Sequence, residues 1–192
     1  MSQKTLNILI RFRKGGDLRM LDEALFSLAV QTYPFLHVII SVKNMDSDLR
    51  QSIQSILDKQ PWATEVTHKL VAVSVAHGED GRSHLINEGL KHTQGSYLAF
   101  LDYDDVVYQH AYQTLISELE KNPRDQIAVG GSRIAILDKG DGFWFVESKN
   151  KAHSWGKDLL DLFKDNFIPI HSYVVHMDRA PSAELYFDES LD

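Results

Sequence analysis

Short apolar runs alternate with amphipathic segments along the chain as far as Lys121. The apolar runs have the length and composition of buried strands, and the segments between them place apolar residues at helical spacing. The expected strands are Leu6–Ile10, Val38–Ile40, Leu70–Val75 and Tyr97–Leu101, and the expected helices are Leu18–Ala29, Ser47–Lys59, Ser83–His92 and Gln109–Lys121. This alternation predicts an α/β fold, in which a mostly parallel sheet carries helices on both faces and binds ligands beyond the carboxyl ends of its strands.

The alternation of strand and helix patterns ends after residue 126. Ile127–Leu137 and Phe143–Val146 flank a segment rich in Gly and Asp, Asp138–Gly142, which is typical of a hairpin loop. Trp155–Phe163 is expected to be a short helix and Ser172–His176 a further strand. We interpret this part as a smaller, more antiparallel and irregular extension of the same domain.

Composition excludes several classes of protein. The chain has 192 residues, 43% of them hydrophobic, which is enough to bury a core without a disulfide or a structural metal. Its 20 basic and 27 acidic residues give a formal charge of −7, so we expect no nucleic acid partner. The chain contains no Cys, begins with a polar segment and has no apolar run of about 18 residues. We therefore expect a cytoplasmic protein with no membrane segment in this chain.

Three carboxylates stand directly after the expected strand Tyr97–Leu101. Asp102, Asp104 and Asp105 lie within four residues, so their charges repel one another unless a cation balances them. A hard divalent ion such as Mg²⁺ or Mn²⁺ accepts carboxylate oxygens and keeps open positions for phosphate oxygens. The cluster therefore favours a metal-bound phosphate compound as the ligand, and the alternative is a solvated acidic turn.

Several motifs follow one another in an order that resembles the family 2 glycosyltransferases. Glu23–Leu28 precedes Gln31–Pro34, and Gly81–Leu90 precedes Leu101–Asp105. The resemblance implies the GT-A fold, a Rossmann-like nucleotide-binding fold, and an inverting transfer of a sugar from a nucleoside diphosphate donor with Mn²⁺ or Mg²⁺. A UDP-sugar is the favoured donor, and a glycan or another hydroxyl compound is the expected acceptor.

The resemblance also divides the chain. Residues 1–126 would form the nucleotide-sugar-binding half of one GT-A-like domain, 1–192, and residues 127–192 would form the start of its acceptor-binding half. Two readings compete with the enzyme: a non-catalytic module that binds a nucleotide sugar, and a nucleotidyltransferase on a related sheet. A nucleotidyltransferase would need a Gly-rich basic loop after the first strand, and Lys14-Gly15-Gly16 is a weak match for such a loop.

The family's D-x-D positions match Asp102 and Asp104. Side chains two apart on an extended chain point the same way, so these carboxylates converge if the extended geometry persists. We predict Asp104 as the direct metal ligand, and Asp102 as a residue that contacts either the ribose or the metal through a bound water. We interpret Asp105 as the N-cap of the following helix rather than as a third acceptor.

Further donor-binding residues are expected before and after this cluster. Gly81, Arg82 and Asn87 match the turn and helix that shape the family's nucleotide pocket, and a glycine lets the backbone approach a ligand closely. The alternatives are a surface charge for Arg82 and a structural polar residue for Asn87. Arg11 and Arg13 follow the end of the expected first strand, Leu6–Ile10, where they either bind the donor's diphosphate or balance the aspartates.

The segment after the second strand departs from the family. Many members carry consecutive aspartates there, one of which binds a pyrimidine, whereas this chain has Ser41–Asp46. Asp46 is interpreted as the start of the next helix. His171 and His176 lie five apart on an expected strand and so face opposite sides, and we interpret them as ordinary surface or partly buried residues rather than a zinc pair.

An inverting displacement needs a carboxylate that takes the acceptor's proton. The family places it in an acidic pair just after the segment that Phe187–Leu191 resembles. We therefore expect the base beyond Asp192, in a longer enzyme, with Asp188 and Glu189 as weaker candidates within the chain.

Overall fold

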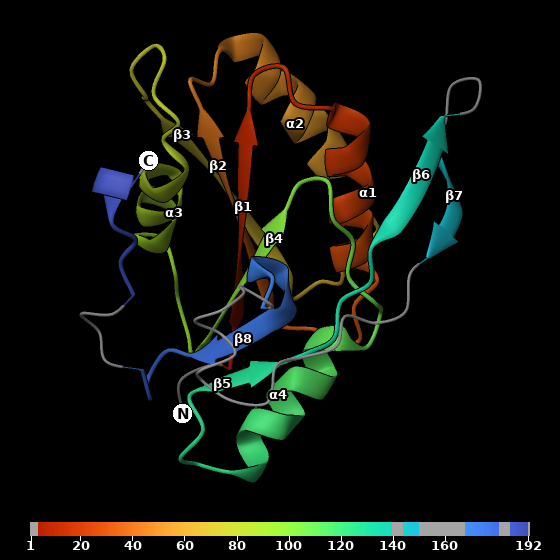
Figure 1. The fold of residues 1–192 in the computed structure, drawn as a ribbon, viewed down its shortest axis with the longest axis vertical. Helices are drawn as coiled ribbons and strands as arrows, with labels where there is room; N and C mark the ends of the chain where they lie inside the picture. The colour runs from red at the N-terminus through yellow and green to blue at the C-terminus, as the bar shows by residue number, and fades with distance from the viewer. Residues whose placement is uncertain (1–3, 140–143, 150–167, 181–184, 192) are drawn as a thin grey trace.

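The computed structural model describes residues 4–139, 144–149, 168–180 and 185–191. Its main sheet has six strands in the order β3-β2-β1-β4-β8-β5 (Figure 1). The strands are β1 (Leu6–Arg13), β2 (Leu36–Lys43), β3 (Thr67–Val73), β4 (Tyr97–Asp102), β5 (Ile127–Val129) and β8 (Tyr173–His176). The pairs of β1 with β2, β1 with β4 and β2 with β3 are parallel, which confirms the predicted mostly parallel sheet.

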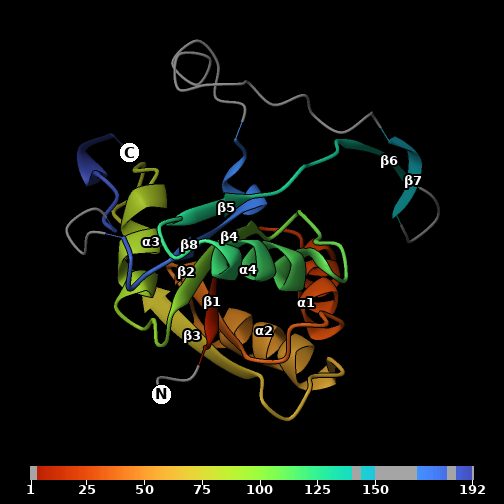
Figure 2. The same ribbon diagram turned by 90° about the horizontal axis from the view of Figure 1, so that it is seen from below.

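Helices cover both faces of this sheet, as the alternation predicts. They are α1 (Leu18–Ala29), α2 (Ser47–Lys59), α3 (Arg82–Leu90) and α4 (Ala111–Lys121). One core cluster joins the strands to α1, α2 and α4, and a second joins them to α3 and the segment near Phe187. Figure 2 shows α3 on the opposite side of the sheet from α1 and α2. Burial on both faces is almost continuous along β1, β2 and β4, which explains their mostly apolar composition.

The region after residue 126 is divided between two sheets. Its strands β5 and β8 join the main sheet, where β8 pairs antiparallel with both β4 and β5. A separate ribbon pairs β6 (Ala135–Lys139) with β7 (Trp144–Lys149), which confirms the hairpin and shows that Ile127–Leu137 is split between β5 and β6. Gly140–Gly142 of the expected loop and the expected helix Trp155–Phe163 lie outside the described residues.

The antiparallel direction of β8 matters for the site. Tyr97 pairs with His176 and Ala99 pairs with Val174, so the start of β8 lies toward the carboxyl end of β4. A short 3-10 turn, η1 (Ile170–Ser172), directly precedes β8 and therefore reaches the edge of the sheet where parallel strands end. Another 3-10 turn, η3 (Glu189–Leu191), lies against α3 in Figure 1. Among the described residues, no helix combines the length and apolar character needed to cross a bilayer.

Candidate active site

Two oppositely charged residues lie near the carboxyl ends of the central strands β1 and β4. Arg11 and Asp102 are partners in the parallel register. Arg11 Nη2 donates to Asp102 Oδ1 at 2.6 Å, and both side chains are partly exposed. Alternation along the strands explains the meeting, because Leu9 and Phe100, two residues earlier on each strand, belong to the same core cluster.

The turn after β4 brings a second carboxylate to the same edge. The backbone N–H of Asp105 donates to the Asp102 carbonyl at 3.0 Å, which reverses the chain. The Asp105 carboxylate then lies 2.7 Å from His171 Nδ1 on η1. The prediction that Asp105 caps a helix is wrong, since α4 begins at Ala111 and His110 is its N-cap. Asp46, in contrast, accepts from the Leu49 N–H and begins α2 as predicted.

The electrostatics of the turn follow from burial and crowding. Partial desolvation in the turn raises the pKa of the Asp104 carboxyl, although the residue is exposed, and the charges of Asp105 and Asp102 raise that pKa further. The hydrogen bond with Asp105 raises the pKa of the His171 imidazole. Arg11 and His171 therefore act as counter-ions to the acidic turn.

These side chains form a group that fits a divalent cation. One ligand atom each from Asp102, Asp105 and His171 lies within 4.8 Å of the others. Two carboxylates and an imidazole are ordinary ligands for such ions, and three protein ligands leave positions open for phosphate oxygens. Among the described residues this group includes Asp102, one of the two predicted metal ligands, while Asp104 lies in the same turn but outside the group. The prediction for Asp104 stays a prediction.

His171 is the member that sequence reasoning missed. The sequence predicts an ordinary histidine on a strand, but His171 lies on η1, before β8 begins. Its position depends on the antiparallel pairing of β8 with β4, which links segments far apart in the sequence. Only an antiparallel pairing of Ser172–His176 with Tyr97–Leu101 places His171 beside the acidic turn, and the sequence contains no local pattern that predicts this pairing.

Gly81 and Arg82 lie at the start of α3. Gly81 is left-handed, with φ of +71°, and a Cβ there would lie 2.7 Å from Val75 Cγ1, so glycine is required on both counts. Arg82 is exposed and pairs with Asp80 at 2.7 Å. A cavity of about 360 Å³ opens beside this turn and is lined by Ser74, Val75, Glu79, Gly81, His84 and Glu189.

Asn87 is buried in α3, with 5% of its surface exposed. Its Nδ2 donates to the Phe187 carbonyl at 2.8 Å and to Glu189 Oε1 at 2.8 Å, and its Oδ1 accepts from the Phe187 N–H at 2.9 Å. The amide therefore faces the C-terminal segment. The predicted donor contact of Asn87 is untested, but the structure gives its polar atoms other partners.

The ends of β1 and β2 differ in what their side chains contact. Arg13 is exposed, two residues beyond Arg11. Asn44 exchanges two 2.9 Å hydrogen bonds with the backbone of Val75, and Lys43 donates to the Asp80 carbonyl at 3.0 Å. The departure from the family's aspartates thus supplies residues that fix the loop leading into α3.

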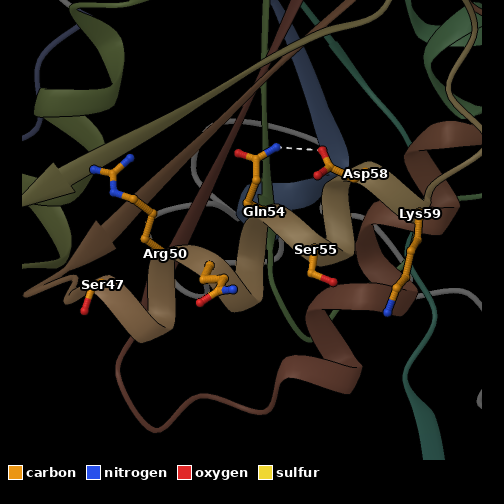
Figure 3. A pocket seen from close by; sticks show the side chains of 7 residues that line it. Ser47, Arg50, Gln54, Ser55, Asp58 and Lys59 are labelled. Atoms are coloured by element: carbon orange, nitrogen blue, oxygen red, sulfur yellow. Dashed lines mark hydrogen bonds between the residues drawn. The ribbon is translucent and has the colours of Figure 1, made fainter.

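A larger hollow lies away from these residues, on the outer surface of α2 (Figure 3). It measures about 590 Å³, and its lining consists of Ser47, Arg50, Gln51, Gln54, Ser55, Asp58 and Lys59. All seven belong to one helix, so the hollow is a shallow surface feature rather than a site built from several elements.

Comparison with known proteins decides the family. The model of the family described as glycosyl transferase family 2 matches residues 17–177. The chain belongs to glycosyl transferase family 2. This family 2 chain is also 26% identical over 132 residues to an uncharacterized glycosyltransferase of Rickettsia bellii, a match that covers 59% of the chain and 19% of that protein.

Solved structures show the same fold. The chain superposes on S. aureus TarS 1-349 with a TM-score of 0.59 and 16% identity, over 98% of this chain and 51% of that one. The mannosyltransferase PcManGT of Pyrobaculum calidifontis, solved with GDP-Man and Mn²⁺, gives a TM-score of 0.50 and 16% identity over 62% of this chain and 34% of that one. The GT-A fold implied by the motifs is thereby confirmed. The chain spans about half of the TarS structure and about a fifth of the Rickettsia relative.

Proposed function

We propose that the chain takes part in the metal-dependent, inverting transfer of a sugar from a UDP-sugar to a hydroxyl of a glycan or another acceptor. The observation that carries the proposal is the acidic turn after β4. In a family 2 chain, at the carboxyl end of a central strand, it combines Asp102 and Asp105 with His171 in a geometry that fits a divalent ion. Support for UDP comes from the fold similarity to TarS 1-349 solved with UDP, at a TM-score of 0.59 and 15% identity. Support for Mn²⁺ comes from PcManGT.

The acidic turn would hold the cation, with Asp104 as the further carboxylate predicted from the sequence. When bound, a divalent ion neutralises charge that develops on the departing diphosphate. Arg11 lies beside Asp102 and would donate to diphosphate oxygens when the donor arrives. Gly81 lines the cavity beside α3, where the nucleoside would lie, and Arg82 follows it in the chain. Arg13, exposed at the end of β1, would be a further contact for the donor.

The general base is proposed to be a carboxylate beyond Asp192, as the family motif implies. Asp188 and Glu189 fit this role poorly. Hydrogen bonds from Ser190 lower the pKa of the Asp188 carboxyl, and hydrogen bonds from Asn87 and His84 lower that of Glu189. A carboxylate whose pKa is lowered is a weaker base for a hydroxyl proton.

A thermal shift screen tests the donor. UDP-, GDP- and dTDP-sugars would be compared with Mn²⁺, with Mg²⁺ and with a chelator. A ligand at a hundred times its Kd stabilises the native state by about 2.7 kcal/mol, or roughly 5 to 10 °C for a chain of this length. We expect the shift with a UDP-sugar and its loss with the chelator. The same shift with the chelator would contradict metal dependence.

Product analysis separates the competing functions. Slow release of UDP from the donor, accelerated by an acceptor, supports the transferase. Donor binding without release by a chain extended beyond Asp192 would favour the non-catalytic module. Release of pyrophosphate from a nucleoside triphosphate would favour the nucleotidyltransferase.

A further inference from the structure

The acidic turn and η1 come from different halves of the chain. Asp102 and Asp105 belong to the end of β4 and the turn after it, whereas His171 precedes β8. The side chains of Asp102, Asp105 and His171 are 32%, 39% and 26% exposed, so an ion can reach them from solvent while the backbone holds them in place. This is a built arrangement rather than a surface cluster of like charges.

The backbone around His171 is fixed from several directions. Both the N–H and the Oγ of Ser172 donate to the Pro169 carbonyl, at 2.9 and 2.7 Å, which closes the turn. The ring of Tyr173 packs against Phe100 of β4 at 6.0 Å between centroids. The imidazole is therefore presented to the acidic turn by an element that is itself anchored to β4.

We propose that His171 is a direct ligand of the divalent cation, together with Asp102 and Asp105, so that metal binding ties the second half of the chain to the nucleotide-binding half. This inference rests on the proposed function and goes beyond it, because the D-x-D positions alone would place every protein ligand in one turn. His171 Nδ1 contacts Asp105 Oδ2 at 2.7 Å and exchanges that contact for the ion when metal binds.

The ligand set carries a preference among metals. Mg²⁺ favours oxygen ligands, whereas an imidazole nitrogen suits transition metals, and affinity for a mixed nitrogen and oxygen site generally rises along the first transition row. The site should therefore bind Mn²⁺ more tightly than Mg²⁺. Replacing His171 by Gln should reduce the ratio of Mn²⁺ affinity to Mg²⁺ affinity, because the substitution removes the nitrogen ligand that Mn²⁺ accepts more readily than Mg²⁺.

Electron spin echo spectroscopy of Mn²⁺ bound to the whole chain, with and without UDP, tests this directly. We expect echo modulation from a directly coordinated nitrogen in the wild type and its loss in His171→Gln. Mn²⁺ affinity should fall about tenfold or more in that variant. The matched control is His110→Gln, which removes an exposed histidine that contacts Thr32 instead of the acidic turn. Both variants would be checked for an unchanged circular dichroism spectrum.

The outcomes separate this inference from the proposed function. Mn²⁺ that binds with UDP but shows no nitrogen modulation would overturn the role of His171 and leave the transferase proposal standing. Modulation that persists in His171→Gln, or an equal loss of affinity in His110→Gln, would also overturn it. UDP binding with no Mn²⁺ binding at all would overturn both the metal site and the metal dependence of the proposed reaction.

Discussion

Asn87 and Phe187 are joined by two hydrogen bonds, one in each direction, so that the side-chain amide of Asn87 pairs with the backbone of Phe187 as a neighbouring strand would. The Phe187 ring packs against Phe100 in the core, with 5.6 Å between the centroids. Glu189 adds its carboxylate to the same amide. The C-terminal segment is therefore held against α3 by the buried Asn87 side chain and against the sheet by the packing of Phe187.

Replacing Asn87 by Ala should lower the melting temperature. The change leaves the N–H and carbonyl of Phe187 without their partner, and an unsatisfied buried group costs about 1 to 3 kcal/mol. For a chain of this length that corresponds to a fall of roughly 2 to 12 °C, measured by thermal unfolding. The control is Arg82→Ala, which removes an exposed ion pair with Asp80 worth about 0 to 1 kcal/mol.

Donor affinity measured on the same two variants decides between the roles of Asn87. If Asn87→Ala melts at the wild-type temperature but binds UDP weakly, Asn87 contacts the donor directly, as the family motif implies. Arg82→Ala should show the opposite pattern, with weaker UDP binding and little change in melting.

The sequence was sufficient for the elements that alternate up to Lys121. Apolar periodicity located β1 to β4 and α1 to α4, because each of these elements buries a face against the same sheet and its pattern is local. The predicted ends differ by a few residues, as for β3, which begins at Thr67 rather than Leu70. The acidic turn was placed correctly at the end of β4 because strand direction fixes which edge it occupies.

Contacts between distant segments could not be read in this way. The pairing of β8 with β4 brings His171 to Asp105, and no local spacing contains that information. The helix-cap prediction for Asp105 was wrong for this reason, since a carboxylate before a helix resembles an N-cap, yet α4 begins only at Ala111. The partners of Asn87 were equally hidden, because the partner of a polar side chain on a helix depends on the segment that covers it.

Arg11→Gln should affect metal and diphosphate binding in opposite directions. The guanidinium competes with a cation for Asp102, so its removal should tighten Mn²⁺ binding several-fold in the absence of nucleotide. UDP binding at saturating Mn²⁺ should weaken, because a charged donor to the phosphates is lost. Isothermal titration of each ligand measures both effects. Arg13→Gln, two residues farther along, should leave the affinity for Mn²⁺ in the absence of nucleotide unchanged. Equal changes of Mn²⁺ affinity in both variants would argue against competition between Arg11 and the cation for Asp102.

The stability of the fold should fall in mild acid because of His37. This histidine is 9% exposed and contacts Thr67 Oγ1 at 2.7 Å, and burial lowers its pKa from the ordinary value of 6.5. At pH values between the lowered pKa of the folded state and 6.5, His37 binds more protons in the unfolded chain than in the folded one. The stability that the neutral His37 contributes is therefore complete above pH 6.5 and is lost as the pH falls below 6.5. Each unit of difference between the two pKa values corresponds to about 1.4 kcal/mol.

Urea unfolding at several pH values between neutrality and mild acid measures the effect. His37→Gln should reduce the loss of unfolding free energy on acidification, whereas His77→Gln, at an exposed position, should leave the loss unchanged. Identical pH dependence in wild type and His37→Gln would show that the buried histidine does not carry it.

Asp104→Asn should stabilise the fold and weaken donor binding. Partial desolvation and the charges of Asp105 and Asp102 raise the pKa of Asp104, which means that the folded state disfavours its ionised form. A neutral side chain of the same shape removes that repulsion, so the melting temperature of the metal-free protein should rise. UDP binding in Mn²⁺ should fall at least tenfold if Asp104 is the metal ligand that the D-x-D positions imply. The control is Asp58→Asn on the outer surface of α2, where the carboxylate contacts Gln54. Wild-type UDP affinity in Asp104→Asn, combined with a large loss in Asp105→Asn, would exclude Asp104 as a metal ligand. Asp105 would keep the ligand role proposed above, and Asp104 would contribute only to the charge of the turn.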